Sequence, residues 1–352
     1  MRLAAGASTR VGVAVSAGCD SCALATLLAR LRPHLGIRKL VLLHLDHGLR
    51  PAAERRRDLE VLRRLAKRAR TPLVVGRARV RAGGKGLEDA ARSARLKFFA
   101  RAVRRLRLGS IAVAHHLDDR IETFFLFLLR GSGSRGLSSL RAVETLDRPG
   151  PIRIVRPLLP FTRADIRQFA ASEKIEYHED STNIDPGFLR NRIRIELVPL
   201  LGEWHPQFRL AMAATISALE SEDAALSELA KSIIQSCGHA ENGAGHGWPS
   251  VERDMDVNRS TAPKNSMSLD RRRLRLFPSA LLARALQQAD RSLGGSGLLG
   301  GHENLSAAVR AILGKSAAVI DLSGGRHLRM DRDRVIFSVA PGPARRRPRT
   351  YV

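Results

Sequence analysis

Apolar residues alternate between short continuous runs and longer amphipathic segments over the first half of the chain. The short runs, rich in Val, Ile and Leu, predict strands at Val11–Val15, Lys39–Leu45, Pro72–Val75, Ser110–Ala114 and Ile152–Val155. Between them, apolar residues recur every three or four positions and predict helices near 21–33, 53–70, 87–107 and 119–130. Strands and helices alternating in this way are typical of βαβ units. We therefore expect an α/β fold with a doubly wound parallel sheet.

The pattern changes after residue 156. A proline-rich segment at 156–160 leads into a helix that we expect Thr162 to cap, and a polar turn follows at 180–186. A long helix is expected around 207–235, whereas 238–266 has few aliphatic residues and indicates a linker or insertion. These changes predict a catalytic domain at 1–205, a helix and polar linker at 206–266, a small second domain at 267–340 and a basic tail at 341–352.

The second domain is expected to be helical or α+β. Periodic apolar positions predict helices at about 270–290 and 303–314. Two apolar runs, Ala318–Leu322 and His327–Val339, flank the glycine-containing segment 323–325 and predict a hairpin. The basic run 345–349 in the tail is most simply a solvated end, although it could also contact phosphates.

Charge changes the choice of partner. Sixty Lys and Arg residues oppose 34 Asp and Glu residues, which gives a net charge of +26. This excess favours a polyanion, either nucleic acid or an anionic membrane surface, over a neutral metabolite. Only eight of the basic residues are Lys. Arg binds phosphate bidentately, but a GC-rich genome would produce the same bias, and the sequence leaves both explanations open.

Cellular location follows from what the sequence lacks. No window approaches the roughly 20 apolar residues of a membrane span, and the first residues do not resemble a signal peptide. Three cysteines, Cys19, Cys22 and Cys237, are too few for a disulfide scaffold. We therefore expect a cytoplasmic protein with no membrane association. Cys19 and Cys22 match Cys-x-x-Cys formally, but no second pair completes a zinc site, and we interpret the spacing as coincidence.

A strand followed by small residues and then a helix is the strongest local signal for a binding site. The loop consists of Ser16, Ala17, Gly18, Cys19, Asp20 and Ser21. Small residues let backbone N–H groups approach an anion, and the helix N-terminus adds partial positive charge, so we expect a pyrophosphate site. Asp20 is the candidate Mg²⁺ ligand. The loop lacks the Gly-Lys-Ser/Thr of a Walker motif. The segment Gly131–Gly136 has the glycine spacing of the dinucleotide-binding motif, but it follows a predicted helix, whereas that motif follows a strand.

This loop resembles the Ser-Gly-Gly-x-Asp-Ser loop of the PP-loop ATP pyrophosphatases. Further segments narrow the resemblance to the tRNA(Ile)-lysidine synthetase family. These segments, which lie in the family's order and roughly at its spacing, are 45–51, 87–95, 114–123, 129–137, 180–183 and 188–194. They cover about residues 11–200. Beyond residue 200 the similarity is looser, although 267–339 looks like the family's small substrate-binding domain.

The resemblance implies a reaction. Members of the family use ATP to adenylate the wobble cytidine in the CAU anticodon of an isoleucine tRNA, which releases pyrophosphate. Free L-lysine then displaces AMP, so that its ε-amine becomes bonded to carbon 2 of the base. ATP and Mg²⁺ are the expected cofactors, and the expected partners are this tRNA and L-lysine. A homodimer is left open.

The same resemblance, together with the required chemistry, suggests roles for individual residues. A cationic amine needs carboxylates, and Asp119 and Glu122 share one face at a helix start, so we expect them to bind lysine and either to accept its proton or to assist through Mg²⁺. The alternative is a structural role, in which their negative charges only stabilise the positive N-terminal end of the helix dipole. Asp46 and His115 at strand ends are expected to contact ATP. Arg95 and Arg192 are expected to bind lysine, with Arg190 and Arg194 on tRNA phosphates.

RNA affinity should come mainly from phosphate neutralisation. The Arg-rich segments 53–70, 92–107 and 271–273 are plausible surfaces for it. His47, His115 and His116 could form a metal set, but nucleotide contacts or structural roles are favoured.

Two departures from the family pattern bear on activity. Ala17 replaces a usual Gly, and its Cβ could obstruct phosphate or shift the backbone. Arg120 replaces the commoner Gln, and we expect its side chain to point to solvent. Two rival functions remain, a thiolase-like PP-loop enzyme acting on tRNA and a non-catalytic RNA-binding relic.

Overall fold

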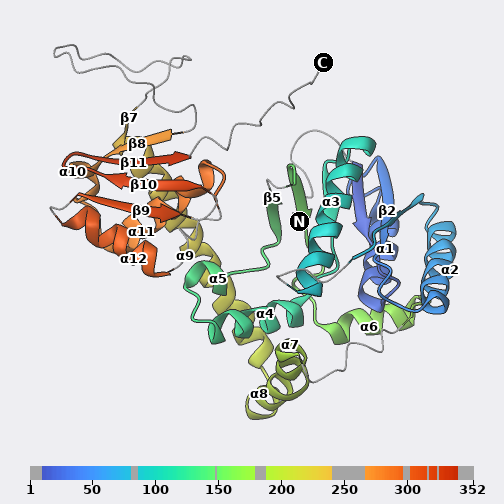
Figure 1. Ribbon diagram of the computed structural model, residues 1–352. Coiled ribbons are helices and arrows are strands. Elements are labelled where there is room, and N and C mark those ends of the chain that lie inside the picture. Colours follow the sequence, from blue (N-terminus) through green and yellow to red (C-terminus); the bar gives the residue numbers. More distant parts are fainter. Residues whose placement is uncertain are drawn as a thin grey trace, which may run out of the picture. The chain divides into compact units, whose positions relative to one another are not determined.

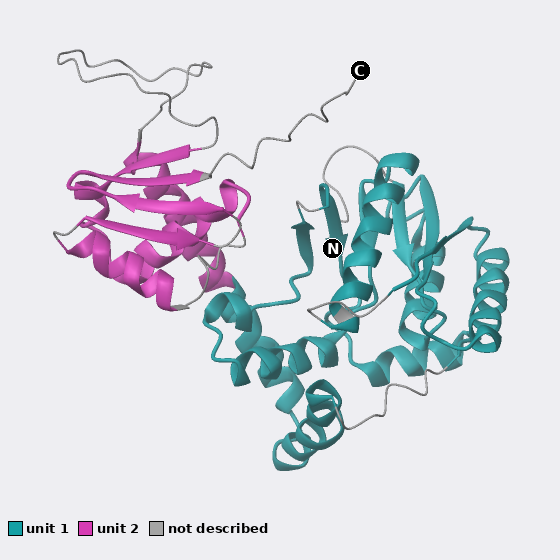
Figure 2. Cartoon of the chain, in the orientation of Figure 1, with its two compact units in different colours: residues 1–220 teal, residues 221–352 magenta. Residues whose placement is uncertain are grey.

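The computed structural model describes residues 10–80, 86–146, 149–178, 188–239, 266–295, 302–314, 317–322 and 325–339. The chain forms two compact units, 1–220 and 221–352 (Figure 2). The boundary between them lies inside one long helix, α9 (Phe208–Cys237). Each unit has its own hydrophobic core, so each is described by itself.

Unit 1 is built on a six-stranded sheet (Figure 1). Its strand order is β3 (Leu73–Arg77), β2 (Lys39–Asp46), β1 (Arg10–Ala14), β4 (Ser110–Ala112), β6 (Ile152–Val155) and β5 (Val143–Leu146). Neighbouring strands run parallel except β5, which pairs antiparallel with β6. The sequence missed β5 but predicted the other five strands.

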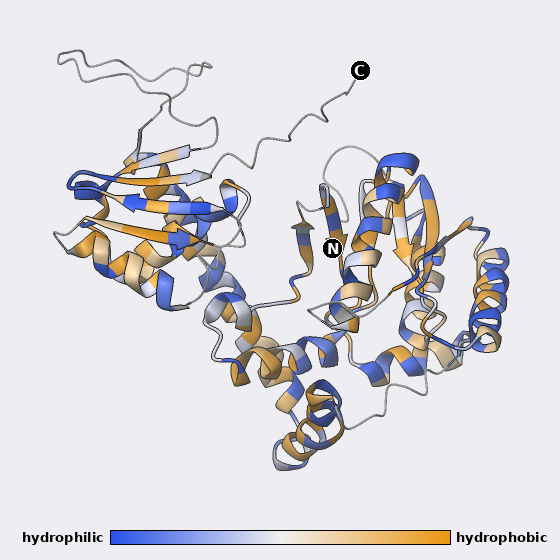
Figure 3. Cartoon of the chain, viewed as in Figure 1, coloured by the Kyte–Doolittle hydropathy of each residue, from blue (hydrophilic) through white to orange (hydrophobic). Residues whose placement is uncertain are grey.

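Helices cover both faces of this sheet. On β2, Leu40 and Leu42 pack toward α1 (Cys19–Leu31), α2 (Ala52–Arg68) and α6 (Arg163–Ser172), whereas Val41 and Leu43 pack toward α3 (Leu87–Leu106). The side chains alternate because successive residues of a strand point to opposite faces. The apolar strands lie between helices whose outer faces are polar (Figure 3). The prediction of a doubly wound α/β fold is therefore confirmed.

The remaining helices of unit 1 form a cluster of their own. It contains α4 (Leu117–Leu129), α5 (Ser134–Leu137), α7 (Leu189–Arg192), a π-helical turn η2 (Ile193–Leu197), α8 (Val198–Trp204) and the start of α9. Ile121 and Ile216 are fully buried at its centre. The predicted cap of α6 is confirmed, because Thr162 Oγ1 accepts a hydrogen bond from the Asp165 N–H (3.2 Å).

Unit 2 contains an antiparallel five-stranded sheet. The order is β7 (Gly238–His239), β8 (Ser266–Asp270), β11 (Arg334–Val339), β10 (Arg326–Met330) and β9 (Ala318–Leu322). The helices are α10 (Arg271–Leu274), α11 (Ser279–Ser292) and α12 (His302–Leu313). They pack, with the end of α9, against Leu269, Leu328 and Phe337 of the sheet.

Three expectations for unit 2 need correction. The run His327–Val339 is two strands, because residues 331–333 turn the chain between β10 and β11. The expected helix 270–290 is two helices preceded by β8, so strand structure begins at the end of the expected linker. Arg271, expected on an RNA surface, is fully buried and donates to the carbonyl oxygens of Ala311 and Gly314.

Several predicted segments lie outside the described residues. They are the polar turn 180–186, most of the linker 238–266, most of the hairpin turn and the tail run 345–349. Among the residues that the structure does describe, no helix is both long and apolar enough to cross a membrane.

Candidate active site

The loop between β1 and α1 is organised around the hydroxyl group of Ser21. Ser21 Oγ accepts a hydrogen bond from the Ser16 N–H (3.1 Å) and donates one to the Gly18 carbonyl (3.0 Å). Gly18 precedes α1 without a side-chain cap, so the first N–H groups of this 13-residue helix are not satisfied by a capping side chain. The loop therefore offers the N–H groups and the partial positive charge that bind an anion.

Ala17 adopts a backbone conformation that usually belongs to glycine. Its φ is +67°, in the left-handed region that side chains with a Cβ rarely enter. The residue is nevertheless fully buried, and its methyl group is part of the hydrophobic core that contains Val15 and Cys22. The methyl group thus points away from the exposed side of the loop. The replacement of Gly by Ala therefore puts strain on the backbone, and its methyl group is not on the surface of the loop that solvent reaches.

The cysteines of the loop have no metal-binding arrangement around them. Burial raises the pKa of the Cys22 thiol to about 12, so this group stays protonated at neutral pH. Within the described ranges no group of three or more His, Cys, Asp or Glu residues is arranged to hold a metal ion.

Asp46 and His115 lie at the carboxyl ends of β2 and β4, the same edge of the sheet as the loop after β1. Asp46 accepts hydrogen bonds from the Gly48 N–H (2.9 Å) and from Arg55 (3.0 Å). Burial raises the pKa of Asp46, but these two donors outweigh it and hold the pKa below its usual value. Burial lowers the pKa of His115 to about 4, because the opposing charge of Asp119 is outweighed by burial together with the charge of Arg156.

The tautomer of His115 is defined by its neighbour. Arg156 Nε donates to His115 Nδ1 (3.1 Å), so the proton of the neutral ring lies on Nε2. Arg156 is itself buried and also donates to the Arg141 carbonyl (2.6 Å) and to Glu144 (2.7 Å). His115 can therefore act as a hydrogen-bond donor toward a ligand at neutral pH.

His116 joins the loop to the acidic start of α4. The ring Nδ1 of His116 accepts a hydrogen bond from the backbone N–H of Asp119 (3.3 Å), and the backbone N–H of His116 donates to Asp119 Oδ2 (3.1 Å). Together these two hydrogen bonds form a capping box. The buried ring Nε2 lies 3.6 Å from Asp20 Oδ2 and 3.5 Å from Asp119 Oδ2. Burial lowers the pKa of His116, but the carboxylates of Asp20 and Asp119 outweigh it and raise the pKa above its usual value. One imidazole ring thus lies between the phosphate loop and the acidic pocket.

The sequence did not single out this ring as the connection. The signal was present, because a polar residue followed three positions later by an acid marks a helix cap. Its link to Asp20, nearly a hundred residues earlier, depends on the sheet topology.

Asp119 and Glu122 lie together, as their spacing predicts, but two arginines already occupy them. Glu122 is 1% exposed and accepts from Arg194 (2.6 and 2.9 Å) and from Arg190 (3.0 Å). Asp119 is 9% exposed and accepts from Arg190 (3.1 Å), with Arg194 at 3.6 Å. Two carboxylates and two guanidinium groups therefore form one compact cluster with little net charge.

Both acids of this cluster have ionised partners. Burial raises the pKa of Asp119, yet His116 and Arg190 outweigh it and keep the pKa below its usual value. Burial lowers the pKa of Arg194, but the hydrogen bonds to Glu122 outweigh it and raise the pKa. Asp119 is accordingly a carboxylate at neutral pH and can receive hydrogen bonds from an ammonium group.

The expected orientation of the three neighbouring arginines is reversed in the structure. Arg190 and Arg194 point to Asp119 and Glu122, whereas Arg192 is exposed and pairs with Glu196 (3.2 Å). The segment is helical, so residues four apart share a face and the residue between them faces the opposite side. The sequence-based expectation also placed Arg192 opposite Arg190 and Arg194, but it put the wrong side of the segment against the acids.

Two other residues of α4 have structural partners. Arg120, expected to point to solvent, is 7% exposed and forms an ion pair with Glu220 of α9. Asp118 accepts hydrogen bonds from the Arg163 N–H (2.8 Å) and from Arg209 (2.8 Å), so it ties α4 to the starts of α6 and α9. Both side chains are buried because the neighbouring helices of the cluster pack around α4.

Arg95 of α3 is exposed at the rim of this edge. Its charge is close enough to lower the pKa of His47 and His115. The motif 180–183 lies outside the described residues.

The donor set fits Mg²⁺ in one respect. Asp20 offers a partly exposed carboxylate, with 32% of its side chain accessible, beside the helix N-terminus. Mg²⁺ typically uses one or two carboxylates and fills its other positions with water and substrate phosphates. A single acid at a phosphate loop is compatible with that behaviour.

The sheet and its loop place the chain in a defined class, the α/β proteins that bind a phosphate group at a loop following the first strand. The chain belongs to the PP-loop domain family, whose sequence model matches residues 3–201.

Within that class the chain is similar to bacterial tRNA(Ile)-lysidine synthases. It is 38% identical over 249 residues to the enzyme of Symbiobacterium thermophilum, a match that covers 70% of this chain and 51% of the relative. It is 37% identical to the enzyme of Pseudomonas aeruginosa, covering 64% and 49%. The chain thus spans about half the length of the curated relatives it matches.

A solved structure shares the fold. A U34-tRNA thiolase from Methanococcus maripaludis, solved with its 4Fe-4S cluster, is similar with a TM-score of 0.51 at 16% sequence identity. The match covers 60% of this chain and 72% of that one. At this identity the similarity extends to the fold alone.

Proposed function

We propose that the chain catalyses the ATP-dependent joining of L-lysine to carbon 2 of the wobble cytidine in the CAU anticodon of an isoleucine tRNA. The observation that carries the proposal is the position of His116, whose ring lies between Asp20 of the phosphate loop and Asp119 of the acidic cluster. A nucleotide site and an amine site thereby become two halves of one site. The similarity to tRNA(Ile)-lysidine synthases supports the choice of substrates.

ATP would bind with its phosphates at residues 16–21 and its nucleoside toward Asp46 and His115. Asp20 would hold Mg²⁺, which neutralises the leaving pyrophosphate when it is bound. The loop N–H groups and the α1 N-terminus orient the triphosphate so that the carbonyl oxygen of the cytidine can attack the α-phosphorus. Pyrophosphate leaves, and the base becomes adenylated.

Lysine would bind with its ammonium group on Asp119. The ammonium must lose a proton before the ε-nitrogen can attack carbon 2 and displace AMP, and Asp119 is placed to accept that proton. Glu122 has a different role from the one its spacing suggests. Because two guanidinium groups neutralise it, we propose that Glu122 positions Arg190 and Arg194, whose remaining donors can bind the lysine carboxylate or a phosphate.

The RNA would be held by charge outside this site. A net charge of +26 predicts that tRNA affinity falls steeply with salt, because each phosphate contact releases counterions. Exposed Arg95 and Arg192 are positioned for such contacts, on α3 and α7.

The deciding experiment is mass spectrometry of nucleosides from the CAU-anticodon isoleucine tRNA after incubation with ATP, Mg²⁺ and L-lysine. Lysidine should appear, with one pyrophosphate released per modified base. A thiolated base in a parallel reaction that contains a sulfur donor in place of lysine would favour the thiolase-like alternative, and tRNA binding with no product in either reaction would favour the RNA-binding relic. Either result contradicts the proposal.

A further inference from the structure

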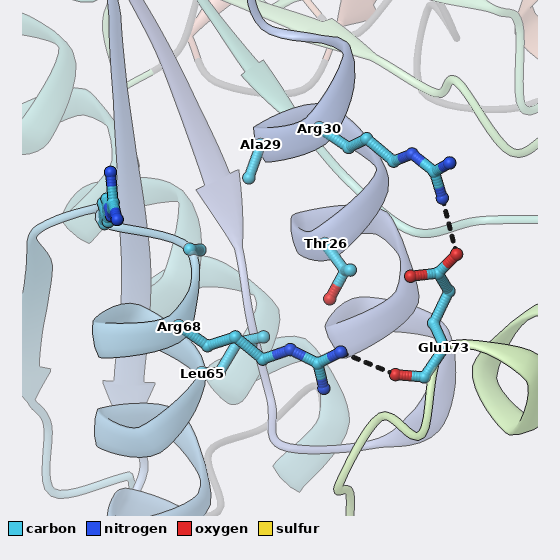
Figure 4. A pocket seen from close by; sticks show the side chains of 8 residues that line it. Thr26, Ala29, Arg30, Leu65, Arg68 and Glu173 are labelled. Carbon is cyan, nitrogen blue, oxygen red and sulfur yellow. Dashed lines mark hydrogen bonds and ion pairs between the residues drawn. The ribbon is translucent and has the colours of Figure 1, made fainter.

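A short segment, 173–178, connects the end of α6 to the phosphate loop, and we call it the strap. Its first half is tied to α1 and α2. Arg30 forms an ion pair with Glu173 (2.5 Å), and Arg68 donates to the carbonyl oxygens of Glu173 (2.8 Å) and Lys174 (3.1 Å). Figure 4 shows the Arg30 and Arg68 contacts to Glu173, beside a pocket of about 240 Å³.

That pocket lies at the C-terminal ends of α1 and α2, whereas the phosphate loop precedes the N-terminus of α1. Two of its arginines, Arg30 and Arg68, donate to a carboxylate and to carbonyl groups that already belong to the strap. We therefore assign this region to holding the strap, which runs from there toward the loop.

The far end of the strap is held by a buried acid. His178 Nδ1 lies 2.8 Å from Oδ1 of Asp58, a residue of α2 that is only 5% exposed. The other oxygen of Asp58 accepts a hydrogen bond from Arg50 (2.9 Å), in the turn that follows β2. One carboxylate thus fixes the strap and the turn after β2 at the same edge of the sheet.

The backbone of His178 reaches the phosphate loop itself. Its N–H donates to the Ala17 carbonyl (2.9 Å). Because a trans peptide is planar, with its C=O and N–H pointing in opposite directions, holding the Ala17 carbonyl also fixes the direction of the Gly18 N–H. In the described part of the chain no protein group accepts a hydrogen bond from the Gly18 N–H. It is a donor at the N-terminal end of α1, where an anion would bind.

The strain at Ala17 makes this contact necessary. A residue with a Cβ at φ +67° is held there only by its surroundings, whereas Gly adopts that conformation without penalty. We propose that Asp58 and His178 are positioning residues that hold the Ala17–Gly18 peptide in the orientation that binds the nucleotide phosphates. Neither side chain needs to touch the nucleotide. The proposal rests on the proposed ATP site.

The test measures binding of Mg²⁺-ATP to the full chain by titration calorimetry. His178→Ala removes the anchor to Asp58, and Asp58→Asn weakens it with little change in volume. Each should weaken ATP binding about tenfold when binding is measured at a temperature at which thermal melts show the variant to be fully folded. Arg64→Gln is the matched control, because it breaks the exposed pair with Glu176 (2.6 Å) on the same strap, and it should change affinity less than twofold.

A second variant separates positioning from a general structural effect. Ala17→Gly removes the need for the contact, so His178→Ala should weaken ATP binding less than threefold in the Ala17→Gly background, against about tenfold in the unmodified protein. This non-additivity is the signature of two residues acting on one peptide.

The outcomes distinguish this inference from the function it rests on. An unmodified protein that binds no ATP overturns both. An unmodified protein that binds ATP, with His178→Ala and Asp58→Asn binding it equally well, overturns only the positioning role. A loss of affinity that Ala17→Gly does not relieve also overturns it, since the peptide would then not be the point of action.

Discussion

Both units bury charged side chains, but they do so in different ways. In unit 2 two buried ion pairs bridge separate elements, Asp290 of α11 with Arg326 of β10 and Asp223 of α9 with Arg284 of α11, and the buried Arg271 donates to backbone carbonyl oxygens. Unit 1 has bridging pairs as well, such as Arg120 of α4 with Glu220 of α9, but there Asp119, Glu122 and their two arginines also gather at one edge of the sheet, beside His116.

The difference shows what a buried charge can be for. A single ion pair between two secondary-structure elements acts as a cross-link. Breaking this ion pair costs stability because the remaining charge has no partner. A cluster at the carboxyl ends of parallel strands lies where α/β proteins bind ligands, and one ring atom there, His116 Nε2, has no protein hydrogen-bond partner among the described residues. Buried charge therefore indicates function here through its clustering and its location.

The largest expected effect is the loss of activity when Asp119 is replaced, and the adjacent Asp118 provides the control. Asp119→Asn should lower lysidine formation by about a thousandfold, roughly 4 kcal/mol of transition-state stabilisation, because the amine loses its carboxylate. Asp118→Asn is the matched control. Asp118 ties α4 to α6 and α9, so its loss should lower the melting temperature and leave the rate within a few-fold. Rate assays and thermal melts of both variants check this, and equal rate losses would contradict it.

The second effect concerns unit 2. Asp290→Ala leaves Arg326 without its buried partner and should destabilise this unit by about 3–5 kcal/mol. Amide hydrogen exchange, followed by mass spectrometry, should show faster exchange in peptides of 266–339. Peptides of the phosphate loop should keep the protection that ATP gives them. Loss of ATP protection in unit 1 would show that the two kinds of buried charge are not independent.

A smaller effect appears with pH. The pKa of His115 is about 4 in the folded protein, against an ordinary value of 6.5. Between these two pH values the ring is protonated in the unfolded chain and neutral in the folded chain. Stability from this residue is therefore present at pH 7 and is lost as the pH falls from about 6.5 toward 4, on the order of 1–2 kcal/mol by pH 5.

His115→Asn keeps an acceptor for Arg156 and removes this titration. Urea unfolding at pH 7 and pH 5 should then show a smaller loss of stability for the variant than for the unmodified protein. His116, whose pKa is raised, contributes with the opposite sign in both proteins, so the comparison between them isolates His115. Identical losses would mean that His115 is not buried as described.

The smallest effect is expected outside the cluster. Arg192→Ala removes an exposed pair with Glu196, with both side chains more than half accessible, and should leave the midpoint of unfolding almost unchanged. Arg194→Ala, two residues away, uncovers the buried Glu122 and should be far more damaging in the same denaturation and product assays. Similar effects from the two substitutions would argue against the orientation described here.

The sequence predicted what depends on local pattern. Apolar runs identified five of the six strands in unit 1, and the small residues at 16–21 marked the anion loop. Asp119 and Glu122 were paired correctly, because their spacing is helical. The reversal of Arg190, Arg192 and Arg194 was within reach of the same rule, since the period of a helix places the first and last of the three on one face.

Other features depend on contacts that no local pattern encodes. Arg120 is buried because Glu220, a hundred residues later, packs against it. Arg271 is buried because its guanidinium group satisfies the carbonyl oxygens at the end of α12. The occupation of Glu122 by Arg190 and Arg194 likewise arises only when α7 and η2 fold back onto α4.

The ring of His116 has a consequence for how the binding of one substrate affects the binding of the other. It is close to two carboxylates, one in the proposed nucleotide site and the other in the proposed amine site. A ligand that draws Asp20 away leaves the imidazole to Asp119 alone, and a cation on Asp119 does the reverse. Since such linkage is reciprocal, whatever factor the first substrate imposes on the affinity for the second, the second must impose on the first.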